Sequence, residues 1–431
     1  MVNLDSFFEL SKRNSNIKTE SLGGLTTFLA MAYITVVNPS ILSQAGMDFG
    51  AVFVATCLAA AFGSVVMGLV GRYPIAQAPG MGQNAFFTFS IVLGMGHPWQ
   101  TALGAVFISG VLFIVLSVLP IREWLINAIP RNLKLGMSAG IGLFLGFIAL
   151  KNAGIVVDNP ATLVALGDIA SFQPVVSLMG FSLIVALAAR NVKGAVIIGV
   201  LVATALGWLT GNAEFQGVVA LPPSPAPVFL QLDIMAAFQI SMLTAILSML
   251  IVDVFDTAGT LVGVANRAGL LDEAGKLPNL SRALLSDSGA TVVGALVGTS
   301  STTSYVESAA GVEAGGRTGL TAVVCGLLFL LCLFFAPLAQ SVPAYATASA
   351  LLFVACLMAR SLADMDWSDS TESAPAVIAA IAMPLTFSIA EGIGLGFISY
   401  VLIKLGSGKA RECGPAAYVI AAIFTCKYAF L

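Results

Sequence analysis

The stretch Pro74-Ile-Ala-Gln-Ala-Pro-Gly-Met-Gly82 interrupts an apolar part of the chain and cannot form a continuous helix. Proline removes a backbone donor, and glycine permits extended or left-handed turns. A second stretch, Thr299-Ser-Ser-Thr-Thr-Ser304, is polar and tolerates extended backbone. Irregular backbone at membrane depth survives only where protein or a cavity satisfies its polar groups. We therefore expect each stretch to form a short strand followed by a half-helix whose N–H groups point at the protein centre, where they favour acceptors or negative charge.

The two broken stretches occupy equivalent places in an internal repeat. The segment Gly68-Leu-Val-Gly71 returns 227 residues later as Ala295-Leu-Val-Gly298, and Ala45-Gly46-Met47 pairs with Ala268-Gly269-Leu270 at an offset of 223. Two halves of about seven spans each follow from this repeat, and an odd number of spans makes the second half enter the membrane from the opposite side. The sequence thus predicts an inverted repeat of the kind that transporters use.

Composition indicates a membrane protein without a large soluble domain. Of 431 residues, 58% are hydrophobic and only 10% are charged, with a mean hydropathy of +0.97, whereas soluble domains carry about 25% charged residues. The 19 Lys and Arg residues form no basic patch, which argues against nucleic-acid binding. We predict an all-α polytopic fold of about fourteen spans in a 7+7 arrangement. The expected spans are 22–44, 50–71, 75–94, 100–120, 132–152, 173–189, 194–211, 234–264, 281–298, 300–316, 318–337, 345–361, 374–388 and 390–405.

The distribution of cations gives the orientation of these spans in a cell (inner or plasma) membrane. With the N-terminus inside, nearly every Lys and Arg falls on the cytoplasmic side, and only Lys151 lies at an outer end. Both termini are expected in the cytoplasm, with Lys427 among the inner cations if the tail stays inside. The predicted cytoplasmic group includes Lys12, Arg13, Lys18, Arg72, Arg122, Arg131, Lys134, Arg190, Lys193, Arg267, Lys276, Arg282, Arg317, Arg360, Lys404, Lys409 and Arg411. The predicted divisions are an N-terminal segment 1–21, a first repeat 22–212, an outer linker 213–233, a second repeat 234–405 and a tail 406–431.

Several carboxylates lie where a membrane protein rarely places them. Asp253 and Asp256 lie inside the apolar run Met242–Val264, and Glu307 lies in the tenth span. An ionisable group at membrane depth is costly and usually faces a cavity, a partner or a substrate. Glu307 stands nine residues after Gly298, as Gly80 stands nine after Gly71, so both begin half-helices. Glu307 is therefore a ligand group or an N-cap. Asp253 and Asp256 share one helical face, so both are functional or one bonds Ser and Thr hydroxyls. Other acidic residues are expected near span ends as solvated or interfacial groups: Asp287, Glu313 and Glu391.

Four stretches, in order along nearly the whole chain, carry a family resemblance. They are Gly24-Leu-Thr-Thr-Phe-Leu-Ala-Met-Ala-Tyr-Ile34, Ala78-Pro-Gly-Met-Gly-Gln-Asn-Ala-Phe86, Phe255-Asp-Thr-Ala-Gly-Thr-Leu261 and Gly298-Thr-Ser-Ser-Thr-Thr-Ser-Tyr-Val-Glu-Ser-Ala-Ala-Gly-Val312. With these motifs the chain resembles the nucleobase–cation symporter superfamily, which includes xanthine and uracil permeases, and within it the AzgA-like hypoxanthine/guanine/adenine permeases.

The resemblance implies seven plus seven spans in a core and a gate domain, with short strands in spans three and ten near the substrate. It also implies uptake of purine bases, usually with a proton. The family's binding residues fall on Asn84, Asp256 and Glu307. Gln83 stands where an aliphatic residue is common and adds a hydrogen bond or faces away. Phe86 stands where Tyr is common.

The expected substrate-binding and proton-coupling groups follow from these patterns. Asn84 offers a donor and an acceptor to a purine edge, or packs helices as a structural amide, and an aromatic side chain should stack on the flat base. Candidate substrate-binding residues are Glu307, Asp256, Asn84, Gly80, Gly82, Phe86, Phe255, Tyr305 and Ser308, and candidate proton carriers are Asp256, Glu307 and Asp253.

The alternatives differ in substrate or in class. A uracil or xanthine permease of the same fold is the runner-up, and two facing carboxylates disfavour an anion exchanger. A channel or a membrane scaffold would not require the inverted repeat. No catalytic motif is present, so we expect no enzyme and no cofactor, with a proton as the coupling ion. The oligomeric state stays open, with a homodimer among its outcomes.

Overall fold

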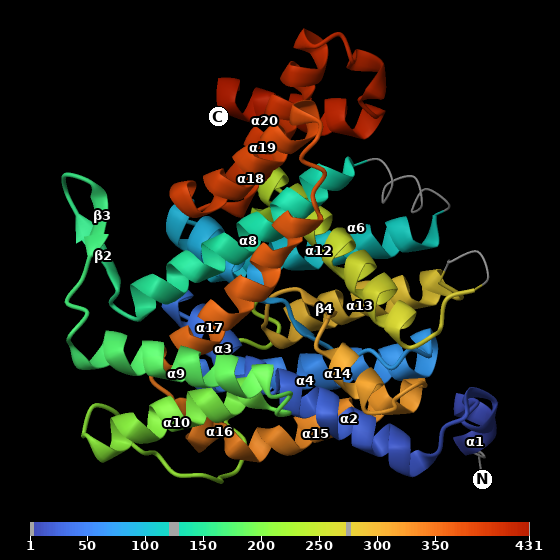
Figure 1. The fold of residues 1–431 in the computed structure, drawn as a ribbon, viewed down its shortest axis with the longest axis vertical. Helices are drawn as coiled ribbons and strands as arrows, with labels where there is room; N and C mark the ends of the chain where they lie inside the picture. Colours follow the sequence, from blue (N-terminus) through green and yellow to red (C-terminus); the bar gives the residue numbers. More distant parts are fainter. Residues whose placement is uncertain (1–3, 120–128, 273–276, 431) are drawn as a thin grey trace.

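The computed structural model describes residues 4–119, 129–272 and 277–430. The predicted spans appear in order, and most helices in Figure 1 run along one common direction. The first half contains α2 (Ile17–Met31), α3 (Ile34–Leu42), α4 (Phe49–Val66), β1 (Gln77–Pro79), α5 (Met81–Ala85), α6 (Trp99–Val118), α8 (Arg131–Asn152), α9 (Phe172–Ala189) and α10 (Ala195–Leu209). The second contains α12 (Ile240–Arg267), α13 (Leu280–Val297), β4 (Thr302–Ser304), α14 (Ser308–Glu313), α15 (Gly319–Cys332), α16 (Ala336–Gln340), α17 (Ala344–Ala359), α18 (Ser370–Thr386) and α19 (Ile389–Gly406).

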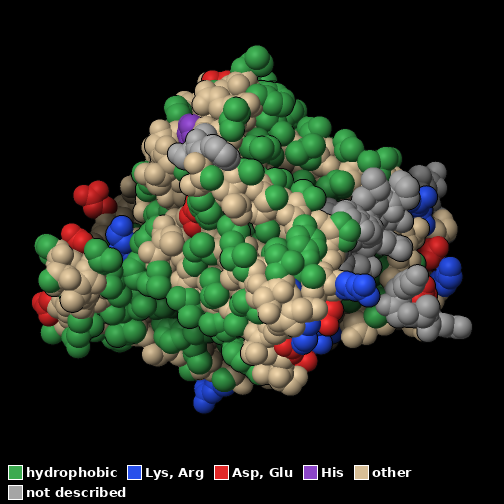
Figure 2. Space-filling view, turned by 90° about the horizontal axis from the view of Figure 1, so that it is seen from above, with side chains coloured by type: hydrophobic (Ala, Val, Ile, Leu, Met, Phe, Trp, Pro, Cys, Tyr) green, Lys and Arg blue, Asp and Glu red, His purple; other side chains and the backbone are tan. Residues whose placement is uncertain are grey.

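The surface and the helix lengths agree with a multi-pass membrane protein. In the described residues, nine helical segments are long and apolar enough to cross a membrane. The remaining predicted spans are the shorter helices α10 and α18, the less apolar 18-residue α13, and the broken pair β1–α5 and β4–α14. The face in Figure 2 is largely apolar, and most of its charged side chains lie toward the left and right edges. Of the predicted cytoplasmic cations, Arg122 and Lys276 lie outside the described residues.

The two broken spans meet at the centre of the molecule, as the sequence predicts. Strands β1 and β4 pair antiparallel, with Gln77 opposite Ser304 and Pro79 opposite Thr302. Gln77 and Ser304 are 227 residues apart, the offset of the sequence repeat. The ladder extends at both ends, because Gly80 N donates to Ser301 O at 2.9 Å and Tyr305 N donates to Ala76 O at 3.0 Å. The half-helices α5 and α14 follow directly.

Side chains of neighbouring helices form hydrogen bonds with backbone groups along the outer edges of these strands. Ser64 Oγ of α4 accepts from Gln77 N at 2.9 Å, and Thr291 Oγ1 of α13 donates to Thr302 O at 2.8 Å. Glycines allow this close approach: a Cβ on Gly63 would lie 2.9 Å from Gln77 Oε1, and one on Gly294 would lie 2.7 Å from Thr302 Oγ1. Each strand is therefore held by equivalent devices in the two halves, and no strand edge is left for lipid.

The helices pack in two groups around the strands. In the core domain, α13 packs on α4 and α6, while α15 packs on α2 and α4. In the gate domain, α8 packs on α17 and α18, and α9 and α10 pack on each other and on α17. The expected core and gate domains are thus present, with β1, β4, α5, α12 and α14 on the core side.

Three features differ from the sequence prediction. A hairpin of β2 (Val156–Asn159) and β3 (Leu163–Leu166) forms in an expected outer loop. The eighth span begins at Ile240, because Ile234–Ala237 is a separate short helix, α11. The tail, for which the sequence predicted no span, forms a helix, α20 (Pro415–Phe430), which packs beside α19. A short helix α1 (Leu4–Phe8) precedes α2.

A buried carboxylate that the sequence placed in the N-terminal segment 1–21 joins the first span to the eleventh. Glu20, in the first turn of α2, has no exposed surface. It accepts from Arg317 N at 3.1 Å, Thr318 N at 3.2 Å and Thr321 Oγ1 at 2.5 Å. Ser15 Oγ also donates to Glu20 Oε1 at 2.5 Å. The other donors lie about 300 residues away in the sequence, so only the fold reveals that Glu20 caps the turn before α15.

Replacing Glu20 with Ala should destabilise the protein by about 3 kcal/mol or more, since each donor left buried and unsatisfied costs about 1–3 kcal/mol. Thermal unfolding in detergent measures the loss. Glu9→Ala is the matched control, because in the described part of the chain the Glu9 side chain pairs with the exposed Lys12, and surface pairs contribute about 0–1 kcal/mol. Equal unfolding temperatures for the Glu20 and Glu9 variants would contradict this role.

Candidate functional site

A cleft of about 330 Å³ separates the core domain from the gate domain. Tyr33, Glu307 and Ala310 line it from the core side, and Lys193 and Phe353 line it from the gate side. The exposed residues Asn191, Lys193 and Glu313 lie at its mouth. The cleft volume falls at the lower end of the range for small-molecule sites. It is thus a site for a compact ligand between two groups of helices.

Glu307 is the acidic group inside this cleft. Tyr33, in the break between α2 and α3, is buried, and its hydroxyl donates to Glu307 Oε1 at 2.6 Å. Glu307 occupies the N-cap position of α14, but its side chain makes no capping hydrogen bond there. No other side chain in the described part of the chain donates to Glu307. Its second oxygen therefore remains an acceptor for a ligand.

Asp256 and Asp253 lie three residues apart on α12 but have different surroundings. Asp256 is exposed and is near enough to Glu307 to interact with it electrostatically, although it does not line the cleft itself. Asp253 is fully buried, and accepts from Gln83 Nε2 at 3.0 Å and from Thr291 Oγ1 at 3.1 Å. Of the two alternatives for Gln83, the structure selects the hydrogen bond. Asp253 thus connects spans three, eight and nine and does not face the cleft.

Asp287 does not lie near a span end as a solvated group, and that expectation is wrong. The residue is fully buried in α13. Its Oδ1 accepts from Gln77 Nε2 at 2.8 Å and Ser304 Oγ at 2.7 Å, and its Oδ2 lies 2.6 Å from the donating Thr257 Oγ1. Thr257 also lies 2.9 Å from Thr303 Oγ1. One carboxylate thereby fixes both strands and the residue that follows Asp256. The signal in the sequence was the place of Asp287 well inside an apolar span.

Asp287→Ala should lower stability by about 3 kcal/mol and abolish transport, because it removes the shared acceptor of three buried donors, and an unsatisfied buried donor costs about 1–3 kcal/mol. Asp287→Asn is the matched variant. It keeps one acceptor for Gln77 and Ser304, and Thr257 can turn its hydroxyl toward Thr303. The Asn variant should therefore retain most of its stability and measurable uptake. Thermal unfolding and uptake, measured together, check both variants, and an Ala variant as stable as wild type would contradict the arrangement.

The glycine, serine and asparagine residues predicted to bind substrate mostly make structural contacts around the site. Gly80 begins α5 in an extended conformation, and a Cβ there would lie 2.8 Å from Thr303 Cγ2. A Cβ on Gly82 would lie 2.5 Å from Ile141 Cγ2 of α8, which places Gly82 between core and gate. Ser308 Oγ accepts from Ala76 N at 3.0 Å. Asn84 is buried and its Oδ1 accepts from Ser300 Oγ, while its Nδ2 lacks a partner among the described residues.

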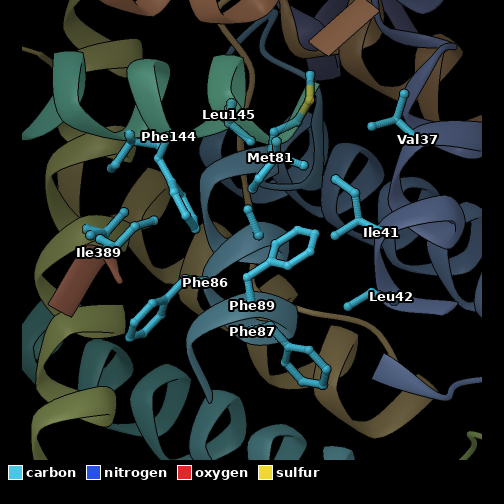
Figure 3. Packing of buried hydrophobic residues seen from close by; sticks show 14 of the residues in the cluster. Val37, Ile41, Leu42, Met81, Phe86, Phe87, Phe89, Phe144, Leu145 and Ile389 are labelled. Carbon is cyan, nitrogen blue, oxygen red and sulfur yellow. The ribbon is translucent and has the colours of Figure 1, made fainter. Parts of the chain in front are cut away.

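The predicted aromatic residues do not line the cleft. Phe86 is buried among apolar side chains, where Figure 3 shows it with Phe87 and Phe89 around one short helix. The Phe255 ring lies 5.0 Å from Lys134 Nζ, and the Tyr305 hydroxyl donates to Pro79 O at 2.6 Å. The aromatic side chains on the cleft wall are Tyr33 and Phe353 instead. Tyr33 stands in the first quoted motif, but the sequence did not indicate which aromatic residues share a wall.

Comparison with known proteins gives close relatives over the full chain. A model of a permease family matches residues 18–395. The adenine permease AdeP of Escherichia coli is 48% identical, with 99% of this chain and 96% of that protein covered. The putative permease MJ0326 of Methanocaldococcus jannaschii is 51% identical, with 99% and 98% covered. The guanine/hypoxanthine permease PbuG of Bacillus subtilis is 46% identical, with 99% and 100% covered.

Solved structures share the fold at much lower sequence identity. The transmembrane domain of the cyanobacterial bicarbonate transporter BicA has a TM-score of 0.66 at 16% identity, with 88% of this chain and 97% of that domain covered. The murine anion transporter Slc26a9, in its inward-facing state, has a TM-score of 0.67 at 12% identity, with 93% and 71% covered. These likenesses show the fold alone.

Proposed function

Because this chain belongs to the permease family, we propose that it is a secondary transporter that imports purine bases together with protons. The observation that carries the proposal is Glu307, whose free acceptor oxygen faces a cleft between core and gate. Purine bases present N–H groups that a fixed carboxylate binds through charge-assisted hydrogen bonds. Curated relatives named as adenine or guanine/hypoxanthine permeases support these bases over the runner-up substrates, uracil and xanthine.

Hydrogen bonding favours two of the buried or membrane-depth carboxylates over the others as carriers of the coupling proton. Asp287 and Asp253 accept from amide or hydroxyl donors on both oxygens, and an added proton would compete with those bonds. Asp256 has no protein hydrogen bond among the described residues, and Glu307 has one. We therefore assign the coupling proton to Asp256 and Glu307, which interact electrostatically with each other.

A nearly neutral base gains no energy from the membrane potential, so its accumulation requires a coupled ion such as the proton. One charge moved through about 100 mV is worth about 2.3 kcal/mol. At about 1.4 kcal/mol per tenfold, this supports roughly 50-fold accumulation. A carboxylate that is neutral while it holds the proton and charged after it releases the proton couples the movement of the proton to that of the base. Alternating access then moves the core domain, with Asp256 and Glu307, against the gate domain.

The mouth of the cleft faces one side of the membrane. The mouth lies at Lys193 and Glu313, beside Arg190, Arg267 and Arg317, which the positive-inside rule places in the cytoplasm. The state described is then open to the cytoplasm, and the N-terminus lies on that side. A purine carried inward would leave past Lys193.

A competition assay tests the substrate class. Purified protein in proteoliposomes takes up labelled adenine or hypoxanthine under an imposed pH gradient, in the presence of an excess of each unlabelled base. Purines should compete and raise the internal concentration above the external one, and a protonophore should abolish that accumulation. Competition by uracil alone, or uptake insensitive to pH, would contradict the proposal. Bicarbonate serves as a control for the fold-related anion transporters.

A further inference from the structure

Helix α20 runs antiparallel to α19 and is tied to it along its length. At the end of α19, Lys404 Nζ lies 2.7 Å from Glu412, just before α20. Further along, a Cβ on Gly394 would collide with the ring of Phe424. At the start of α19, Glu391 pairs with Lys427 and accepts from the Tyr428 hydroxyl. The last turn of α20 therefore lies beside the first turn of α19.

The length and the apolar composition of α20 suit the same membrane environment as α19. Its 16 residues, Pro415–Phe430, span about 24 Å at 1.5 Å per residue, and α10, which belongs to the predicted seventh span, has 15. Apart from Lys427 near its end, α20 has no charged residue. Apolar side chains such as Val419, 58% exposed, face outward. A helix of this composition that accompanies a membrane span from end to end lies in the bilayer with it.

We propose that α20 is a fifteenth membrane-crossing helix, so that residues Lys427–Ala429 lie on the outer side, opposite to the N-terminus. In Figure 1 the end of α20 lies on the side of the β2–β3 hairpin, an expected outer loop, and the N-terminus lies on the other side. The prediction of a cytoplasmic tail rested on the short length of its apolar segment. Lys427 would join Lys151 as an outer cation, and in the structure it is paired with Glu391. This inference does not depend on the substrate.

Cysteine labelling in intact cells tests this topology. In a background with the exposed thiols Cys356 and Cys426 changed to Ser, Ala429→Cys marks the end of α20, and Ser407→Cys marks the turn before it. Both positions are exposed. A membrane-impermeant maleimide should label Ala429→Cys in intact cells and Ser407→Cys only after permeabilisation. Labelling of both only after permeabilisation would overturn the proposal.

A reporter fusion gives a readout that does not depend on thiol exposure. Alkaline phosphatase, which is active only outside the cytoplasm, is joined after Ala429 or after Ser407 of the full preceding chain. Activity of the Ala429 fusion, with an inactive Ser407 fusion, supports the fifteenth crossing. An inactive Ala429 fusion of normal abundance would overturn it.

Discussion

Glu307→Gln should weaken purine binding by at least tenfold, which corresponds to about 1.4 kcal/mol. The substitution keeps the size of the side chain and leaves an oxygen for the Tyr33 hydroxyl. It replaces the free carboxylate oxygen with an amide nitrogen, which cannot accept from a purine N–H. Hydrogen bonds to charged groups contribute about 1.5–3 kcal/mol, so a larger loss is within range. Equilibrium binding of labelled purines to the purified variant measures the effect.

Glu313→Gln is the matched control, because Glu313 lies at the exposed mouth of the same cleft and pairs there with Arg267 at 3.2 Å. That variant should bind purines like the wild type. If the Glu307 variant kept full affinity for every purine, Glu307 would not be the binding group. A similar loss in the Glu313 variant would indicate a general electrostatic effect of the cleft.

Asp256→Asn should abolish accumulation driven by a pH gradient while purine counterflow continues. The Asn side chain imitates the protonated carboxylic acid, so position 256 stays neutral throughout the cycle. Exchange of one base for another needs no release of a proton and therefore continues. Proteoliposomes containing wild-type or variant protein allow both measurements under the same conditions. Since accumulation supported by about 100 mV is roughly 50-fold, its loss is a large effect.

Asp253→Ala separates coupling from folding. Asp253 is buried and fixed by Gln83 and Thr291, so its variant should lose folding yield, binding and transport together. If the Asp256 variant behaved in this way, Asp256 would have a structural role. If it kept pH-driven accumulation, the coupling proton would belong to Glu307.

Much of the fold was accessible from the sequence because it depends on local signals. Pro74, Pro79 and Gly80 rule out a continuous helix wherever they occur in a membrane span. The 227-residue repeat even gives the register of the central strands, since it relates Gln77 to Ser304. Hydropathy gave the order of the spans because each crosses the bilayer as an independent apolar segment.

The site was less accessible, because its contacts join distant segments. Asp287 takes its donors from spans three, eight and ten, and no single window of sequence contains them. Asp253 and Asp256 lie three residues apart on α12, and only the packing of that helix decides that Asp253 is buried while Asp256 is exposed. Phe86 and Tyr305 were credible as stacking residues from composition alone, but packing directs both away from the cleft. The pairing of α20 with α19 likewise depends on Glu391, which lies 36 residues before Lys427.

The most direct test of the central claim is purine protection of a thiol placed in the cleft. Ala310→Cys, one turn from Glu307 on the cleft wall, is introduced with Cys356 and Cys426 changed to Ser, and its rate of reaction with a maleimide is followed in purified protein. A saturating purine should slow this reaction at least tenfold, and the same concentration should give no protection when Glu307 is also changed to Gln. Equal rates with and without purine, in protein that demonstrably binds the base, would place the substrate elsewhere.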